Sequence, residues 1–313
     1  MSDPMNPYAK LHLSPAGPGD QRPTALQIIE DLQLKDKFAD TVIMITAGSS
    51  GIGIETAQAL YSTGAQIYLM IRNKHRAKAI ITKKGAQQFL GMSQQLNVVI
   101  NNAGILACPY TITSDGFERQ FAVDYLSHFA MTTMLLSTLI ASSSVAFKSR
   151  VIYVGSSSHR YSNIRFNDIN FKGGNDPFLA YRQSKTAVTW SANHLDRLYR
   201  ARGVRALSLN PGGVMSGLQQ YATEEQHETW KNDKVMWTLM KSPEQGAATT
   251  VWAAVAPLWE DKGGFYLSDC KAAPLASNMS SAVDDGHIPH CYGPVDEEHL
   301  WILSLAMAKV TAP

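Results

Sequence analysis

Short apolar runs alternate with helical patterns along most of the chain. The run over residues 41–48 is a short continuous apolar stretch that ends in a glycine, which is typical of a strand buried on both faces of a parallel sheet. The predicted strands are residues 41–48, 65–73, 96–104, 150–158, 204–213 and 263–268. Helical patterns lie between them, over residues 51–64, 118–141, 180–203 and 242–260. This alternation predicts parallel βαβ units, and therefore a single-domain α/β fold with a doubly wound, Rossmann-type sheet flanked by helices.

One interval between the predicted strands is unusually short. Only 23 residues separate Arg72, at the end of the second strand, from Leu96, at the start of the third. A helix, a strand and a second helix need about 25 to 30 residues, because each crossover takes about a dozen. We therefore expect a single helical crossover and a sheet that lacks one edge strand. The second strand would then be an exposed edge, which a homodimer could cover.

The domain is expected to begin at Thr24. Thr24 and Gln27 have the spacing of a capping box, which predicts the start of a helix. Residues 1–23 are rich in proline and carry no secretory signal, so we expect a poorly ordered arm followed by one domain over residues 24–313.

The bulk composition narrows the class of partner. The chain is 45% hydrophobic and 17% charged, with a net charge of +2. Neither sign of charge dominates enough to favour nucleic acid or a membrane surface as the main partner, so a small molecule is the expected ligand. The longest apolar run, residues 131–147, is shorter than the roughly 20 residues that span a bilayer, and no integral membrane segment is expected.

The cysteines suggest a reducing compartment. Cys108, Cys270 and Cys291 are scattered and form no CxxC pair, so neither a disulfide framework nor a metal site is predicted. We expect a cytoplasmic protein.

A glycine-rich turn follows the first predicted strand, in "ITAGSSGIG". A turn between a buried strand and a helix offers backbone N–H groups and the positive end of a helix to a pyrophosphate. Its spacing is not GxGxxG, and an ordinary tight turn is the alternative. Ala47 stands where such turns have a glycine, and alanine is small enough to replace a glycine whose φ is negative. The candidate cofactor-binding residues are Gly48, Ser49, Ser50, Gly51, Ile52 and Gly53.

The end of the second predicted strand bears on the choice of cofactor. In folds of this type, the residue there meets the adenosine ribose, and an acidic residue would bind a free 2′-hydroxyl. Arg72 stands there instead and would neutralise a 2′-phosphate, which favours NADP(H) over NAD(H). Lys74 and Arg76 could assist, or could be solvated residues at a helix start.

The most specific pattern is "YRQSK". Tyr181 and Lys185 are four residues apart on a predicted helix and therefore lie on one face of it. A lone YxxxK arises often by chance. Here it follows "VGSSSH" at the end of a strand and precedes "NPGGVMSG", so chance agreement is improbable.

Together these segments resemble the short-chain dehydrogenase/reductase family, and more closely its branch of retinol dehydrogenases and WW-domain oxidoreductases with their fungal relatives. The segments that carry the resemblance are "ITAGSSGIG", "NNAG", "DGFERQFAVDYLSHF", "RVIYVGSSSH", "YRQSKTA", "LNPGGVMSGL" and "SPEQGAATTVWAA". The similarity runs from about Thr24 to "EEHLWILS". It implies an oxidoreductase that uses NADP(H) to reduce a carbonyl, or oxidise a secondary alcohol, on a small lipophilic substrate, such as a secondary metabolite.

The resemblance also implies roles for single residues. Ser156, or alternatively Ser157, would bind the substrate carbonyl. Tyr181 would be the general acid or base, and Lys185 would lower its pKa and bind the nicotinamide ribose. The remaining cofactor contacts would come from two further segments, with Asn102, Ala103 and Gly104 on the adenosine side and Pro211, Gly212 and Val214 at the carboxamide.

Asp124 departs from the family pattern, which has an asparagine in that position. An ionised carboxylate could pair with Lys185 and raise the pKa of Tyr181, favouring reduction over oxidation. With Ala47 and the short interval, it keeps two alternatives open. One is a non-redox isomerase, dehydratase or cyclase on the same fold, and the other is an inactive interaction protein.

The substrate end of the site is expected in residues 214–242, where the family has its lid. Thr223 and Gln226 predict a helix within this segment. Its larger apolar side chains could face a lipophilic substrate or could pack the lid onto the body; they are Trp230, Met236, Trp237 and Met240.

Overall fold

The computed structural model describes residues 3–71, 79–174, 176–278, 284 and 286–313. Its seven strands form one sheet in the order β2-β1-β3-β4-β5-β6-β7, and all neighbours are parallel except β6 and β7. The strands are β1 (Val42–Thr46), β2 (Gln66–Met70), β3 (Val98–Asn101), β4 (Ser149–Val154), β5 (Val204–Asn210), β6 (Tyr266–Ser268) and β7 (Lys271–Ala272). The predicted α/β class and its parallel sheet are confirmed.

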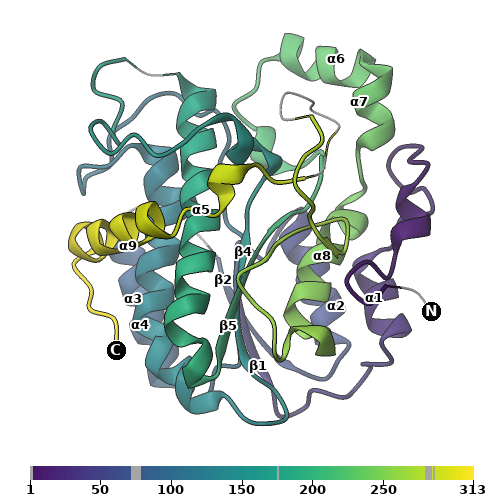
Figure 1. Ribbon diagram of the computed structural model, residues 1–313, viewed down its shortest axis with the longest axis vertical. Coiled ribbons are helices and arrows are strands. Elements are labelled where there is room, and N and C mark those ends of the chain that lie inside the picture. The colour runs from purple at the N-terminus through teal and green to yellow at the C-terminus, as the bar shows by residue number, and fades with distance from the viewer. Residues whose placement is uncertain (1–2, 72–78, 175, 279–283, 285) are drawn as a thin grey trace.

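Helices cover both faces of the sheet (Figure 1). On one face lie α1 (Ala25–Asp31), α2 (Ile52–Tyr61) and α8 (Pro243–Val255). On the other face lie α3 (Ala79–Met92), α4 (Ser127–Ser142) and α5 (Pro177–Tyr199), with α9 (Pro294–Ala308) packed against α4 and α5. None of the described helices combines the length and apolar character needed to cross a membrane.

The position of each strand in the sheet explains its burial. Every residue of β1, β3 and β4 is buried, because helices cover both faces there. β2 is an edge strand of the described sheet and Leu69 on it is 45% exposed. Between β2 and β3 the described residues contain one helix, α3, while residues 72–78 lie outside them. The exposed edge agrees with the prediction; a homodimer across it stays a prediction.

Local capping signals set where several helices begin. The Thr24 hydroxyl accepts from Gln27 N at 3.2 Å, and the Ser242 hydroxyl accepts from Gln245 N at 3.3 Å. The single helix predicted over residues 118–141 is partly wrong, since a π-helical segment, Phe121–Leu126, precedes α4. Such wider turns occur often at functional sites, and this one carries Asp124.

The lid and the N-terminal arm pack together beside the sheet. Residues 214–242 contain a 3₁₀ turn (Gly217–Gln219), α6 (Glu224–Asn232) and α7 (Lys234–Leu239). A backbone bridge between Val214 and Lys241 closes the base of this lid. The end of the arm contacts both the lid and α8: Gly17 N donates to the Thr238 carbonyl at 3.0 Å, and Gly19 N donates to Gln245 Oε1 at 3.0 Å. The Arg22 side chain is buried here. A poorly ordered arm and a domain that begins at Thr24 stay predictions.

Candidate active site

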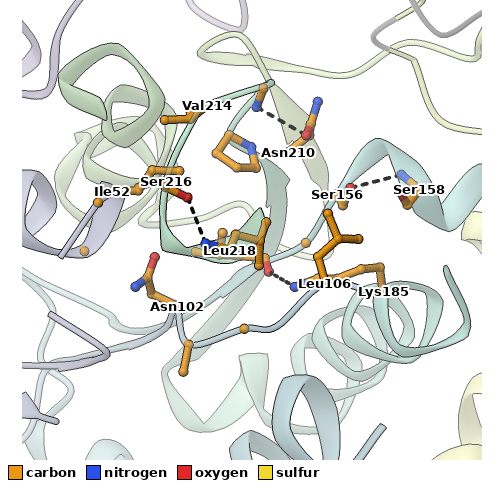
Figure 2. Close-up of a pocket in the computed structure, with 18 of the residues that line it drawn as sticks. Ile52, Asn102, Leu106, Ser156, Ser158, Lys185, Asn210, Val214, Ser216 and Leu218 are labelled. Atoms are coloured by element: carbon orange, nitrogen blue, oxygen red, sulfur yellow. Dashed lines mark hydrogen bonds between the residues drawn. The ribbon is translucent and has the colours of Figure 1, made fainter. Parts of the chain in front are cut away.

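A cavity of about 1350 Å³ lies at the carboxyl ends of the parallel strands, where open α/β sheets bind ligands (Figure 2). The segments that follow β1, β3, β4 and β5 line it, together with α5, the lid and the arm. The fold brings most of the predicted site residues to this one wall: Ser49, Ser50, Gly51, Ile52, Gly53, Asn102, Ala103, Gly104, Ser156, Tyr181, Lys185, Pro211, Gly212 and Val214.

The turn after β1 differs from the expectation at Ala47. The sequence suggests that this alanine replaces a glycine of negative φ, but Ala47 has a φ of 54°. That expectation is wrong, and the left-handed conformation costs a non-glycine residue about 1–2 kcal/mol. Gly51 has the same φ of 54° without this cost, because it lacks a Cβ. The displaced glycine therefore introduces strain at the start of the turn.

Two other glycines of the turn lie in close contact with neighbouring atoms. A Cβ on Gly48 would lie 2.5 Å from Leu69 Cδ2, so this glycine packs the turn against β2. A Cβ on Gly53 would lie 2.3 Å from the Ala47 carbonyl oxygen and 2.7 Å from Asn102 Nδ2. α2 begins here without a side-chain cap, so its first N–H groups are left to a ligand. The turn fits an anionic group such as a pyrophosphate.

Thr46 ties this turn to the segment after β3. Its hydroxyl oxygen accepts from Asn102 N and Ala103 N, both at 2.9 Å, and lies 3.0 Å from His128 Nε2. Asn102 Nδ2 returns a bond to the Thr46 carbonyl at 3.0 Å. The two predicted cofactor segments thus form one hydrogen-bonded unit, and Thr46 is a supporting residue that the sequence motif did not single out.

The predicted contact to a 2′-phosphate lies outside the described residues. Arg72, Lys74 and Arg76 all fall within residues 72–78. Met70 and Ile71, just before them, line the cavity, so β2 does lead to its wall. The preference for NADP(H) stays a prediction.

Ser156, Tyr181 and Lys185 come from two elements that meet at the cavity. Ser156 ends the segment after β4, and its hydroxyl accepts from Ser158 N at 3.1 Å (Figure 2). Tyr181 and Lys185 lie one turn apart on α5, with Lys185 Nζ 5.4 Å from the centre of the tyrosine ring. Lys185 Nζ also donates to the Val154 carbonyl at 3.1 Å. Ser157 also lines the cavity, so both serines remain candidates for the hydrogen bond to the substrate carbonyl.

Asp124 is buried beside Lys185, but its direct hydrogen bonds are to other groups. Its carboxylate accepts from Ile105 N at 2.9 Å and from the Ser184 hydroxyl at 3.1 Å. Gly104 lies against both groups: a Cβ there would be 3.6 Å from Lys185 Nζ and 3.7 Å from Asp124 Oδ1. The carboxylate and the ammonium group interact through their charges.

Burial and these charges set the proton affinities of the site. Burial raises the pKa of Asp124 to about 6, although the positive charge of Lys185 opposes the rise. Burial lowers the pKa of Lys185, and Asp124 opposes that shift. Burial also raises the pKa of Tyr181, Asp124 raises it further, and a hydrogen bond with Ser156 lowers it. Tyr181 is therefore protonated near neutral pH and is a better proton donor than acceptor in this state.

The segment after β5 contributes residues that the sequence did not single out. A Cβ on Gly51 would lie 3.2 Å from Ser216 Cβ, and a Cβ on Gly104 would lie 3.6 Å from Leu218 Cδ1. Ser216 and Leu218 therefore cross above the glycine turn and the segment after β3 (Figure 2). Both belong to "NPGGVMSGL", so the motif already contained the signal.

The lid divides its large apolar residues between two surfaces. Met236 and Met240 line the cavity. Trp237 packs against the arm, where a Cβ on Gly17 would lie 3.6 Å from its Nε1. Trp230 stacks edge-on with His227, with ring centres 5.5 Å apart. The two methionines therefore reach the cavity and Trp237 packs the lid against the arm; contact of the methionines with a lipophilic substrate stays a prediction.

The arm also contributes to the cavity wall. His12, Leu13, Pro15 and Arg22 line it, although none of them belongs to a recognised motif.

The three cysteines are buried free thiols. Within the described ranges, no three His, Cys, Asp or Glu side chains are grouped so as to hold a metal ion.

Comparisons with known proteins agree on one family. The family described as short chain dehydrogenase matches residues 41–93 and 83–227. Short-chain dehydrogenase/reductase prx1 of Penicillium roqueforti is 40% identical over 326 residues, covering 97% of this chain and 95% of the relative. Human retinol dehydrogenase 11 is 33% identical, covering 74% of this chain and 78% of the relative. A crystal structure of an uncharacterized Mycobacterium paratuberculosis protein aligns with a TM-score of 0.64 and 27% identity, covering 88% of this chain and 96% of that one.

The two family matches overlap at residues 83–93, inside the crossover between β2 and β3. The aligned length of 326 residues exceeds the 313 residues of this chain, so the fungal relative has residues that this chain lacks.

Proposed function

The chain belongs to the short-chain dehydrogenase/reductase family, and we propose that it is an NADP(H)-dependent oxidoreductase that reduces a carbonyl on a small lipophilic substrate, or oxidises the corresponding secondary alcohol. The observation that carries the proposal is the meeting of Ser156, Tyr181 and Lys185 in one cavity with the glycine turn. A fungal relative named as a dehydrogenase/reductase supports the same reaction class.

The glycine turn would hold the cofactor pyrophosphate. The uncapped N-terminus of α2 fits it, because the first N–H groups of the helix have no side-chain partner there. Gly53 packs this helix start against the Ala47 carbonyl and Asn102. Asn102, Ala103 and Gly104 would follow the adenosine side, and Pro211, Gly212 and Val214 the carboxamide. Ser216, which crosses above the turn, would close over the bound group. When bound, the nicotinamide supplies or accepts the hydride.

The protein side of the reaction is proton transfer at Tyr181. Ser156 would donate a hydrogen bond to the substrate oxygen and hold it next to the Tyr181 hydroxyl. Tyr181, whose pKa is raised, would donate the proton in reduction. Lys185, anchored on the Val154 carbonyl, places a positive charge beside the ring and would stabilise any phenolate that forms.

The expected substrate is lipophilic. Several apolar side chains line the cavity: Leu106, Phe178, Leu218, Met236 and Leu239. Such a wall favours an apolar molecule with a carbonyl group, such as a secondary metabolite, in a protein for which we propose a cytoplasmic location.

A second candidate is non-redox catalysis as an isomerase, dehydratase or cyclase in the same cavity. The observation that favours it is the positive φ of Ala47, because an enzyme without a nicotinamide cofactor would tolerate a strained cofactor turn. Asp124 is buried and is not one of the residues that line the cavity, so we propose it as a modulator of Tyr181. An inactive interaction protein is the weakest alternative, because it gives the Ser156–Tyr181–Lys185 grouping no role.

The two candidates differ in their need for a nicotinamide cofactor. A panel of apolar ketones should be reduced with NADPH and left unchanged without it, and Tyr181→Phe should abolish the reaction. Conversion of a substrate without cofactor, abolished by Tyr181→Phe, would favour the second candidate.

A further inference from the structure

Arg22 is a buried arginine of the N-terminal arm that clasps the end of the lid. The residue is only 5% exposed. Its Nη1 donates to the Leu239 carbonyl at 2.9 Å. Its Nη2 donates to the Met240 carbonyl, and it also donates to the Gly17 carbonyl, at 3.1 Å. Its Nε donates to Asp20 Oδ1 at 2.8 Å. The planar fork of arginine makes these bonds together, which a lysine cannot do.

The arm is also fastened to the start of α8. Gln245 Nε2 donates to the Asp20 carbonyl at 3.0 Å and to the Arg22 carbonyl at 3.1 Å. Gln245 Oε1 accepts from Gly19 N at 3.0 Å while it accepts from Ser242 N, also at 3.0 Å, in the helix cap. The cap that begins α8 therefore doubles as the attachment point of the arm.

Lys241 continues this set of contacts to the loop after β5. It directly follows Met240, and its N–H donates to the Gly213 carbonyl at 2.8 Å. Its side chain lies over Gly212, where a Cβ would be 3.0 Å from Lys241 Cδ and Cε. Its Nζ is held by Asp269 Oδ1 at 2.5 Å. Lys241 thus fixes one side of the Pro211–Val214 loop.

We propose that the N-terminal arm is part of the cofactor site, with Arg22 as a positioning residue that holds Met240 and Lys241 and, through them, the Pro211–Val214 loop. The proposal rests on the proposed function, which assigns that loop to the nicotinamide carboxamide. A loop ordered before binding loses less conformational entropy when the ligand arrives. The arm therefore raises cofactor affinity without touching the reacting atoms.

Two substitutions at Arg22 and one control test this role. Arg22→Met removes all four donor contacts, and Arg22→Lys keeps the charge without the fork. Lys10→Met is the control, because it removes a charge from an exposed position of the same arm. We expect the NADPH dissociation constant to rise about tenfold in Arg22→Met and about threefold in Arg22→Lys, with kcat at saturation within twofold of wild type. Lys10→Met should match the wild type.

Amide hydrogen exchange measures local opening at Lys241 separately from the global stability of the protein. The Lys241 amide, which donates to Gly213, should exchange faster in Arg22→Lys, under conditions where amides of β4 exchange as in wild type.

The inference is overturned if the Arg22 variants lose thermal stability but keep both the NADPH dissociation constant and the Lys241 exchange rate of the wild type. Should Arg22→Met fail to fold, Arg22→Lys and Asp20→Asn decide by the same readouts. Wild-type protein that binds no nicotinamide cofactor would refute the proposed function, and with it the cofactor role of the arm. Unchanged Lys241 exchange would refute the positioning separately.

Discussion

Around β4 and α5, the cavity wall is made of residues whose side chains are each held in place. Ser156 accepts from Ser158 N and Lys185 donates to the Val154 carbonyl, while Tyr181 is buried with its ring centre 5.4 Å from Lys185 Nζ. Around β1 and β2 the wall departs from the family pattern, with Ala47 at a positive φ and a short crossover after β2. Different local segments build the acid–base group and the cofactor turn, so one can change while the other is kept. We therefore expect faults in cofactor affinity and not in chemistry.

The largest effect is expected in the wall around β4 and α5, from Tyr181→Phe. Loss of the proton donor should lower kcat by about 10²–10⁴-fold, while calorimetry should show an NADPH affinity within twofold of wild type. A variant that keeps more than a tenth of the wild-type kcat would show that another group transfers the proton.

The next largest effect is expected in the glycine turn, from Gly53→Ala. The added Cβ would lie 2.3 Å from the Ala47 carbonyl oxygen, and relieving such a clash costs about 1–3 kcal/mol. We expect NADPH to bind about 10- to 100-fold more weakly, measured by fluorescence titration. Gly91→Ala is the matched control, because nothing lies within 4 Å of a Cβ there. Equal affinities for the two variants would remove the turn from the cofactor site.

Asp124→Asn tests the one departure from the family pattern that lies next to Tyr181 and Lys185. Without the carboxylate the pKa of Tyr181 should fall, because the charge that raises it is gone. Alcohol oxidation at pH 8 should become about threefold to tenfold faster, and its pH–rate profile should shift toward lower pH. An unchanged profile would show that Asp124 does not act on Tyr181.

The same variant has a predicted effect on stability that depends on pH. Since folding raises the pKa of Asp124 to about 6, its contribution is most favourable below pH 4 and is lost as the pH rises through 6. Asp124→Asn should therefore raise the melting temperature by about 4 °C at pH 8 and leave it unchanged at pH 4. The opposite pH trend in differential scanning fluorimetry would contradict the burial of an ionising carboxyl group.

The smallest effect is expected from Ala47→Gly. Glycine adopts a φ of 54° without a steric penalty, but it also gains freedom in the unfolded chain, and the two effects partly cancel. The net gain should be about 0–1 kcal/mol by denaturant titration. A clear loss of stability would show that Ala47 is not strained in the folded chain.

The features predictable from the sequence were those carried by local patterns. The apolar runs predicted the parallel strands, and Thr24 and Ser242 marked the starts of their helices. The i, i+4 spacing of Tyr181 and Lys185 placed both on one face of α5. The positive φ of Ala47 was not predictable, because glycine is the residue that usually indicates a positive φ and this position is an alanine. The hydrogen bonds of Arg22 to the lid were not predictable either, since its partners lie 217 and 218 positions away in the chain.

Paired calorimetric titrations of the wild-type protein with NADPH and NADH test the central claim most directly. If the cavity is a competent cofactor site with Arg72 at the ribose, NADPH should bind at least about tenfold more tightly than NADH, as expected for one charge-assisted contact. Binding of neither nucleotide would contradict the account, because the intact Ser156, Tyr181 and Lys185 would then have no hydride to act with.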